Sequence, residues 1–173
     1  MRHDEDKNEQ LLRVVRNVAG SGIVYVRTRD GCEQLTEFLR DAGVAATCYH
    51  GGLANAERSI RQEEWLAGRT RIMVATNAFG MGIDKPNVRF VIHYNMPKDL
   101  ESYYQEAGRA GRDGEPARCI LLYSGTDVRT IRFFIDKERE ADNGLPADVK
   151  AEAARKAEER LKYMTFYSTT QKC

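Results

Sequence analysis

The sequence has no apolar stretch long enough to cross a membrane, and it begins with polar residues. A membrane-spanning helix needs about 20 consecutive apolar residues, and a secretory signal contains an apolar core behind its first charges. Neither pattern occurs in the 173 residues, which start Met-Arg-His-Asp. We therefore expect no contact with a membrane. The expected location is the cytoplasm, in association with the nucleoid of a bacterium, or the nucleus of a eukaryote.

Paired cysteines and an excess of one charge are also missing. No Cys-x-x-Cys pair occurs among the four widely spaced cysteines, Cys32, Cys48, Cys119 and Cys173. Neither a disulfide framework nor a complete zinc site is indicated, and reduced thiols are expected in a cytosolic protein. The net charge is only +1. Any contact with nucleic acid must therefore be a local patch.

What is present is an alternation of apolar and amphipathic segments. Short apolar runs predict buried strands at residues 22–26, 44–49, 71–75, 88–94 and 117–123. Apolar residues at helical spacing predict helices at residues 4–19, 30–42, 54–67, 99–104, 128–135 and 148–163. Asp30 is expected to cap the second helix, with Glu33 in the capping-box position. The predicted fold class is α/β, with an open, mostly parallel sheet covered by helices on both faces.

Two arginines stand among glycines in residues 105–114, Gln-Glu-Ala-Gly-Arg-Ala-Gly-Arg-Asp-Gly. Arg109 and Arg112 carry planar forks of donors that suit phosphate oxygens, and glycine lets the backbone approach a ligand closely. The composition alone is equally typical of a solvated loop. The regular placement of each arginine directly after a glycine, beyond a predicted helix, favours a phosphate contact.

Polar or glycine-containing segments follow four of the predicted strands. Ligands of open α/β sheets bind outside the carboxyl ends of the strands. The segments at residues 27–29, 50–52, 76–84 and 95–97 should therefore share one edge. We expect the arginine block to lie beside them and to form a single interface with them.

Residues 72–89 and 102–114 closely resemble motifs V and VI of the RecQ family of superfamily 2 helicases. Residues 22–28 and 49–53 look like that family's motif IV region. A DEAD-box RNA helicase would carry Ala-Arg-Gly-Leu-Asp where this chain has Phe-Gly-Met-Gly-Ile-Asp. The resemblance implies the second RecA-like domain, of the P-loop NTPase type, of an ATP-dependent 3′ to 5′ DNA helicase acting in recombination and repair. This domain would span residues 1–141.

The resemblance also implies roles at the phosphate site. Arg112 matches the arginine finger that reaches the γ-phosphate of ATP, and Arg109 matches a second phosphate or coupling contact. Asp84 matches a residue that approaches the ATP ribose or orients an arginine of motif VI. Gln105 matches a residue that links the nucleotide to the DNA. From the residues alone, Asp84 is also a common turn residue, and Gln105 is compatible with a surface amide.

On the DNA side, Thr76 matches a threonine that contacts a phosphate of single-stranded DNA. Thr28, Arg29 and His50 occupy similar positions after strands and are expected to extend the same track. Such contacts position a strand without recognising its sequence. His93 is expected to be a packed strand residue rather than a catalyst.

The segment lacks other parts of the implied enzyme. No Gly-x-x-x-x-Gly-Lys-Ser/Thr loop and no Asp-Glu-x-His sequence occurs, so ATP and Mg²⁺ would be bound mainly by a first RecA-like domain of the same polypeptide. The segment alone should neither hydrolyse ATP nor unwind DNA, although single-stranded and duplex DNA are the expected partners of the whole enzyme. The remaining alternatives are a non-catalytic nucleic-acid-binding module with a helicase-like fold and an RNA helicase domain.

The last residues suggest a truncated extension. Residues 163–173 look like the start of the family's zinc-binding region, with Cys173 at the position of its first ligand. Residues 142–173 are therefore expected to form a helical extension that binds Zn²⁺ only in a longer protein. We expect residues 164–167 to lack a partner that buries them.

Overall fold

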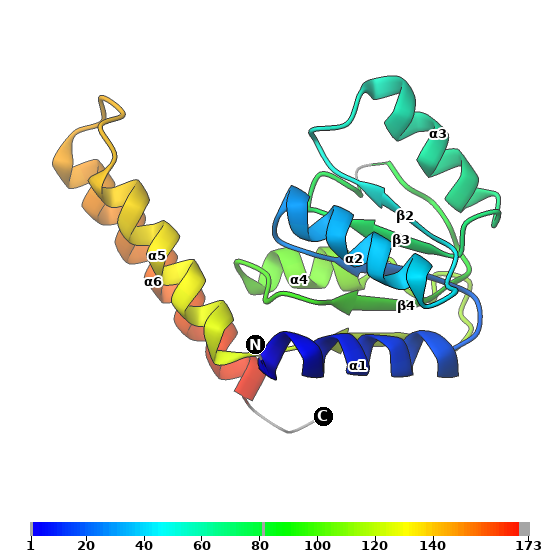
Figure 1. Cartoon of the computed structure of the whole chain (residues 1–173). Helices are drawn as coiled ribbons and strands as arrows, with labels where there is room; N and C mark the ends of the chain where they lie inside the picture. Colours follow the sequence, from blue (N-terminus) through cyan, green and yellow to red (C-terminus); the bar gives the residue numbers. More distant parts are fainter. Residues whose placement is uncertain (1, 81, 170–173) are drawn as a thin grey trace. The chain divides into compact units, whose positions relative to one another are not determined.

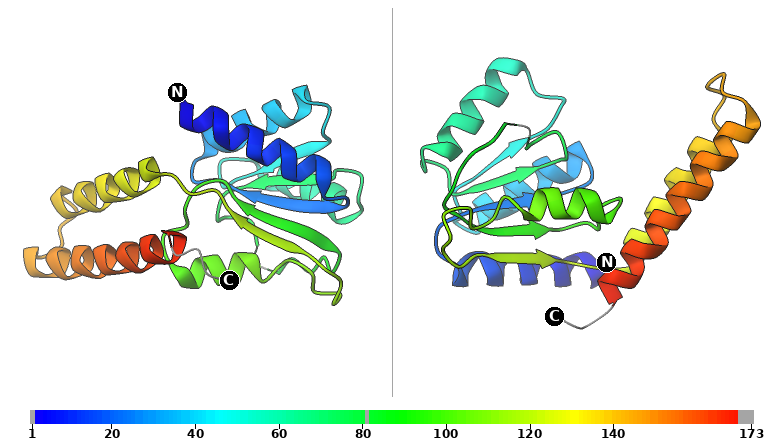
Figure 2. Two further views of the ribbon diagram at one scale, coloured as in Figure 1. Left: turned by 90° about the horizontal axis from the view of Figure 1, so that it is seen from below. Right: turned by 180° about the vertical axis from the view of Figure 1, so that it is seen from behind.

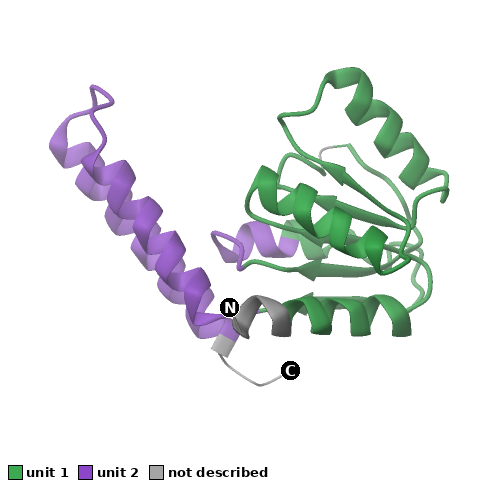
Figure 3. Cartoon of the chain, in the orientation of Figure 1, with its two compact units in different colours: residues 1–95, 105–122 green, residues 96–104, 123–173 purple. Residues whose placement is uncertain are grey.

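The computed structural model describes the backbone of residues 2–80 and 82–169 and the side chains of residues 7–80 and 82–168. The chain forms two compact units (Figure 3): residues 1–95 with 105–122, and residues 96–104 with 123–173. The predicted domain boundary after residue 141 falls inside the second unit. This division reflects packing alone, so the functional boundary stays a prediction.

The first unit is built on a sheet of five parallel strands in the order β2-β3-β1-β4-β5 (Figure 1). The predicted α/β fold with an open parallel sheet is confirmed. The central strand, β1, pairs with β3 on one side and β4 on the other. The strands are β1 (Ser21–Tyr25), β2 (Ala46–Tyr49), β3 (Ile72–Ala75), β4 (Val88–His93) and β5 (Arg118–Leu121).

Alternate side chains of the strands build two apolar layers, one on each face of the sheet. Val24 and Ile92 face helices α1 (Arg2–Asn17) and α2 (Arg29–Asp41). Ile23 and Val91 face the side that holds α3 (Asn55–Leu66), whose Trp65 is fully buried. Figures 1 and 2 show α1 and α2 together on one face. The loop between β3 and β4 packs on the second face together with α3, since its Phe79 and Ile83 lie in the same apolar layer as Trp65.

The start of α2 differs from the predicted capping arrangement. Thr28, not Asp30, is the N-cap, because its backbone is extended and its Oγ1 accepts a hydrogen bond from the Gly31 amide at 3.0 Å. Asp30 lies inside the first helical turn, where a carboxylate favours the helix dipole. Glu33 is not part of a capping box and instead pairs with His50.

The second unit contains a helical hairpin made of α5 (Gly125–Glu140) and α6 (Ala147–Thr169), and it includes the first part of α4 (Leu100–Ala107). The expectation that nothing buries residues 164–167 is wrong for Met164, whereas Phe166 is 70% exposed. Helix α6 continues through them, and Met164 is fully buried. The ring of Tyr167 lies 5.5 Å from that of Tyr103, so residues 96–104 supply the missing partner. Cys173 lies outside the described residues.

Gly22 in β1 provides a test of the central packing. A Cβ atom at this position would overlap the ring of Phe90, which is fully buried on β4. We expect Gly22→Ala to lower the free energy of unfolding by about 1–3 kcal/mol or more, as for other overpacked cores. Urea denaturation measures this loss. Gly51→Ala is the matched control, because its Cβ would meet only Arg29 Nη2, at 3.6 Å; equal losses for the two variants would contradict the packing argument.

Candidate functional site

Four predicted DNA contacts lie at the carboxyl edge of the sheet. Strands β1, β2 and β3 end together, because Tyr25 and Tyr49 are both in register with Ala75. Thr28 and Arg29 follow β1, His50 follows β2, and Thr76 follows β3, in agreement with the expectation that these segments share one edge. The Thr76 amide also donates to the Tyr49 carbonyl at 3.2 Å, which ties two of the strand ends together.

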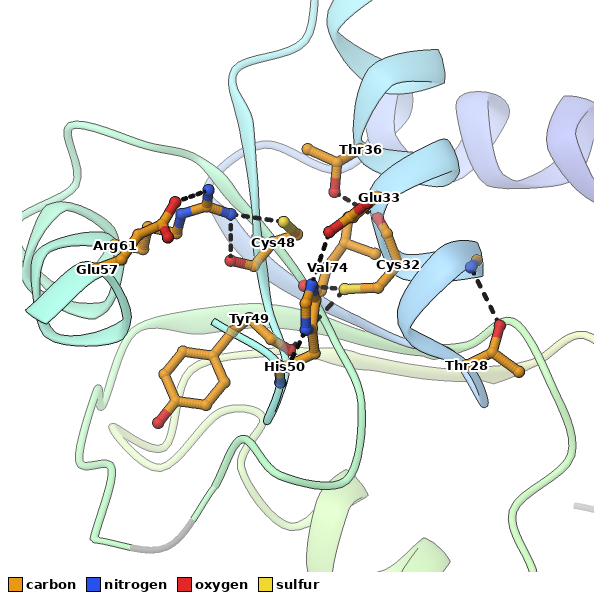
Figure 4. A network of polar contacts seen from close by, with 12 residues as sticks. Thr28, Cys32, Glu33, Thr36, Cys48, Tyr49, His50, Glu57, Arg61 and Val74 are labelled. Atoms are coloured by element: carbon orange, nitrogen blue, oxygen red, sulfur yellow. Dashed lines mark hydrogen bonds and ion pairs between the residues drawn. The ribbon is translucent and has the colours of Figure 1, made fainter. Parts of the chain in front are cut away.

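The four residues differ in their accessibility. Thr28 and Arg29 are exposed, whereas Thr76 is 7% and His50 is 4% exposed. His50 Nε2 lies 3.0 Å from Glu33 Oε1, and His50 Nδ1 accepts from the Gly52 amide at 3.1 Å (Figure 4). Both ring nitrogens are therefore engaged within the protein. In this arrangement His50 fixes the loop at residues 50–52, and a direct DNA contact requires one of the two bonds to open.

Behind this edge lies a sulfur-containing network that the sequence analysis did not identify. Arg61 Nη1 lies 2.6 Å from Cys48 Sγ, and Cys32 Sγ donates to the Val74 carbonyl at 3.1 Å (Figure 4). A hydrogen bond from Cys32, together with the charge of Arg61, lowers the pKa of Cys48 to about 6 against the opposing effect of burial. The same hydrogen bond and burial raise the pKa of Cys32. These contacts link α2 to strand β3 and α3 to strand β2.

The arginine block lies at the opposite, amino edge of the sheet. The Gly111 amide donates to the Val88 carbonyl at 2.9 Å, and the Asp113 amide donates to the Pro86 carbonyl at 3.1 Å. Val88 is the first residue of β4. The expectation that the arginines lie beside the strand-end segments therefore holds for residues 76–84, which contact both arginines, but it is wrong for the segments that stay at the carboxyl edge. The reason is topological: the connection from β4 to parallel β5 has to return along the sheet, so the residues after α4 reach the edge where strands begin.

An ion pair holds the arginine block at this edge. Arg89 Nη2 donates to both carboxylate oxygens of Asp113, at 2.6 and 2.7 Å, and Arg89 Nη1 donates to the Pro116 carbonyl at 3.0 Å. The hydrogen bond from Arg89 and one from the Glu115 amide lower the pKa of Asp113. Bidentate pairing of this kind fixes geometry as well as charge. No motif in the sequence analysis singled out Arg89.

Arg112 is exposed to solvent, and contacts with the neighbouring loop fix the direction of its side chain. Its side chain is 41% exposed, and its Nη1 lies 3.3 Å from the Ile83 carbonyl and 3.9 Å from Asp84 Oδ1. Since a guanidinium has five N–H groups, donors remain for a ligand. Asp84 and Arg112 are thus brought together at the amino edge. Gln105 is exposed on α4, a position that is compatible with both interpretations of its amide.

Arg109 points inward. Its Nε atom is buried and has no hydrogen-bond partner among the described residues. Lys85 is also buried, with Nζ donating to the Leu66 carbonyl at 3.0 Å and lying 5.4 Å from the centre of the Trp65 ring; burial lowers its pKa. The small depression at these cations is lined by Ile23, Trp65, Ile83, Lys85, Val88, Arg109 and Arg112.

This donor set fits phosphate oxygens better than a whole nucleotide or a metal. The two arginines supply donors, one of them unsatisfied. Within residues 2–80 and 82–169, no three His, Cys, Asp or Glu side chains gather where a metal ion could be held. No helix in the same residues is long and apolar enough to span a membrane. His93 is 1% exposed and packs as expected for a strand residue.

The model of the helicase conserved C-terminal domain matches residues 6–114. The chain belongs to this family. It is 44% identical over 170 residues to the ATP-dependent DNA helicase RecQ of Bacillus subtilis, covering 98% of this chain and 27% of that protein. It is 46% identical over 137 residues to a putative ATP-dependent DNA helicase Q1 of Caenorhabditis elegans, covering 79% of this chain and 22% of the relative. The C-terminal helicase domain is thus homologous to those of RecQ-family DNA helicases, and the chain spans about a quarter of these two relatives.

Solved structures of helicases share the fold. The RNA helicase Prp28 of Chaetomium thermophilum, bound to ADP, aligns with a TM-score of 0.64 and 26% identity over 78% of this chain and 35% of that chain. A DEAD box protein of Methanococcus jannaschii aligns with a TM-score of 0.65 and 29% identity over 76% and 36% of the respective chains. These structures support the RecA-like helicase fold that the strand order shows.

The Arg89–Asp113 pair should keep the arginine block in place. In Asp113→Asn the charge of the acceptor is lost, so we expect the Gly111 amide to exchange with solvent about ten-fold faster, since a hydrogen bond to a charged acceptor is stronger than one to a neutral acceptor. Because the pKa of Asp113 is depressed, its contribution is present above the ordinary carboxyl pKa and is lost as the pH falls through the lower folded value. Hydrogen exchange followed by NMR tests this.

Asp84→Asn is the control for that experiment, because Asp84 is 84% exposed and lies 3.9 Å from its partner. Its effect on the Gly111 amide should stay within two-fold. Unchanged exchange at Gly111 in Asp113→Asn would show that the backbone bonds alone hold the block.

Proposed function

We propose that this chain is the C-terminal motor domain of an ATP-dependent 3′ to 5′ DNA helicase of the RecQ family, working in recombination and repair. The observation that carries the proposal is the placement of two polar sites on opposite edges of one sheet, with a single loop running from Thr76 to Asp84 between them. Such a domain would act in the cytoplasm at the nucleoid, or in the nucleus of a eukaryote.

The amino edge is the proposed nucleotide side. ATP and Mg²⁺ would be held mainly by a first RecA-like domain of the longer polypeptide, and this chain would contribute Arg112 and Arg109 to the phosphates. Negative charge spreads over the transferring phosphoryl group during hydrolysis, and a well-placed arginine stabilises it. The neighbouring Asp84 would orient Arg112 or meet the ribose, and Gln105 would connect the two sides. The relatives named as ATP-dependent support the use of ATP.

The carboxyl edge is the proposed DNA side. The Thr76 hydroxyl and the exposed Thr28 and Arg29 would contact backbone phosphates of single-stranded or duplex DNA, while His50 holds the adjoining loop. Contacts of this kind depend on charge and hydrogen bonds rather than on base sequence. They therefore suit a motor that must pass over any sequence.

Coupling between the edges follows from their separation. Strands rise about 3.3 Å per residue, so the two edges lie roughly 15 Å apart. A single hydrogen bond or ion pair to a ligand therefore cannot connect the two sites directly. The loop after β3 begins at Thr76 and passes Ile83 and Asp84 beside Arg112. Closure of the two RecA-like domains on ATP would thus alter the grip on DNA through this loop.

RNA unwinding is the second candidate, because Prp28 and other aligned structures are RNA helicases or DEAD-box proteins. The sequence identities favour DNA, because they are 44–46% with the two DNA helicases and 26–29% with the two solved structures. Stimulation of ATP hydrolysis by single-stranded DNA but not by RNA of the same sequence would support the first proposal. We further propose that residues 142–173 begin a zinc-binding region to which Cys173 contributes one ligand.

Arg112 is the residue that tests the nucleotide site. In the longer helicase, Arg112→Ala should lower the rate of hydrolysis by about 10³-fold or more, the scale of an arginine finger, and leave ATP and DNA affinities within a few-fold. The reason is that the charge matters most in the transition state. Single-turnover hydrolysis and nucleotide titration measure the two effects separately.

Arg112→Lys and Arg109→Ala complete that experiment. An ammonium group does not reproduce the two-pronged contact of a guanidinium, so Arg112→Lys should restore little activity. Near wild-type turnover of Arg112→Lys, or loss of DNA binding as severe as the loss of hydrolysis in Arg112→Ala, would remove the finger role from Arg112. Arg109 would then be the better candidate.

A further inference from the structure

Tyr25 connects the central strand to the middle of the loop between the two edges. It is the last residue of β1 and is 4% exposed. Its hydroxyl donates to the Phe79 carbonyl at 3.3 Å. This bond uses the only hydrogen of the phenol, so the remaining capacity of the oxygen is that of an acceptor.

Arg109 occupies the space directly beyond Phe79. A Cβ atom on Gly80 would lie 2.7 Å from Arg109 Cζ and closer still to Nη2, so the guanidinium packs on a surface that only glycine provides. Gly80 also has a φ of +145°, a conformation that other residues rarely adopt. The arginine of motif VI and the glycine of motif V are therefore in contact at the centre of the loop.

Phe79 and Gly80 are neighbours in the chain, so the Tyr25 oxygen, which is bonded to Phe79, and the Arg109 guanidinium, which packs on Gly80, meet at the same point of the loop. Burial raises the pKa of Tyr25, and the nearby charge of Arg109 opposes the rise. The Tyr25 oxygen thus ties the central strand to the part of the loop on which the arginine packs.

The ring of Tyr25 is itself held from β4 and α4. It stacks on the His93 ring, with centroids 5.3 Å apart and planes inclined by 20°. His93 Nε2 lies 2.7 Å from Glu106 Oε2. Glu106 lies in the last turn of α4, and Arg109 follows two residues beyond the end of that helix. The contacts therefore begin and end on the segment that carries the arginines.

We propose that Tyr25 is a positioning residue for Arg109: seated by His93 and Glu106, it holds the guanidinium against Gly80 and so keeps the motif V loop and the motif VI arginines in register. This rests on the proposed function of Arg109 as a phosphate or coupling contact. Tyr25 acts only through Arg109 and touches neither ATP nor DNA.

The test is a double-mutant cycle in the longer helicase, with Tyr25→Phe, Arg109→Ala and both together. Tyr25→Phe keeps the ring that stacks on His93 and removes only the oxygen. We expect DNA-stimulated kcat to fall about ten-fold, with KM for ATP and Kd for single-stranded DNA within two-fold and the melting temperature within a few degrees. In the Arg109→Ala background the same change should have no further effect on kcat, because the group that it positions is gone.

Tyr94→Phe is the matched control. Tyr94 follows the last residue of β4 and takes no part in the contacts between Tyr25, His93, Glu106 and Arg109. The substitution removes a hydroxyl that donates to Asn8 Oδ1 at 2.9 Å. Its kcat should stay within two-fold of wild type.

The outcomes separate this proposal from the function on which it rests. If Arg109→Ala lowers kcat but Tyr25→Phe stays within two-fold of wild type, or if the two effects multiply in the double variant, Tyr25 does not act through Arg109. If neither Arg109→Ala nor Arg112→Ala affects hydrolysis, the nucleotide role of the block is wrong and the positioning role is overturned with it. A fall in kcat in Tyr94→Phe equal to that in Tyr25→Phe also contradicts the proposal.

Discussion

Parallel pairing of every strand determines where chemistry occurs in the first unit. A parallel sheet requires each connection to carry the chain back to the edge where strands begin. Residues that follow a strand and residues that follow a crossover helix therefore lie on opposite edges, as Thr76 and Arg112 do. One consequence is that a ligand at either edge influences the other only through the protein. The segment between β3 and β4 contains no helix. It crosses the second face of the sheet directly and so links the two edges.

Close contacts between glycine backbone and large side chains determine the path of the loop between β3 and β4. Gly22 lets Phe90 lie flat across β1, and Gly80 lets Arg109 lie across the loop. Lys85 then fastens the loop to the end of α3 through the Leu66 carbonyl. Each contact joins segments that are distant in sequence, so these tertiary contacts hold the loop in addition to the local hydrogen bond from the Phe79 amide to the Thr76 carbonyl. This arrangement is consistent with a segment that has to respond when its partners move.

The sequence allowed the strands, the parallel sheet and most helices to be predicted, because buried runs and helical spacing are local signals. Three features differed from the prediction, for identifiable reasons. Thr28 and Asp30 are both good capping residues, and only the folded chain, in which Glu33 turns to His50, decides between them. The partner of Met164 comes from residues 96–104, which no periodicity links to α6. The edge on which Arg112 lies was predictable from the crossover rule. The contact between Tyr25 and Arg109 was not, since it depends on how three elements pack.

Arg109 and Arg112 have the same local sequence, a glycine followed by an arginine, yet different surroundings. A buried guanidinium is costly unless its donors are matched, and Arg109 has Tyr25 beside it but an unsatisfied Nε. Arg112 remains 41% exposed and close to the carbonyl of Ile83. An anionic oxygen that reached Arg109 would satisfy a donor that the protein leaves unpaired among its described residues. These surroundings are consistent with the proposed roles, a finger at Arg112 and a second phosphate or coupling contact at Arg109. This difference is what makes a positioning residue useful at Arg109 and unnecessary at Arg112.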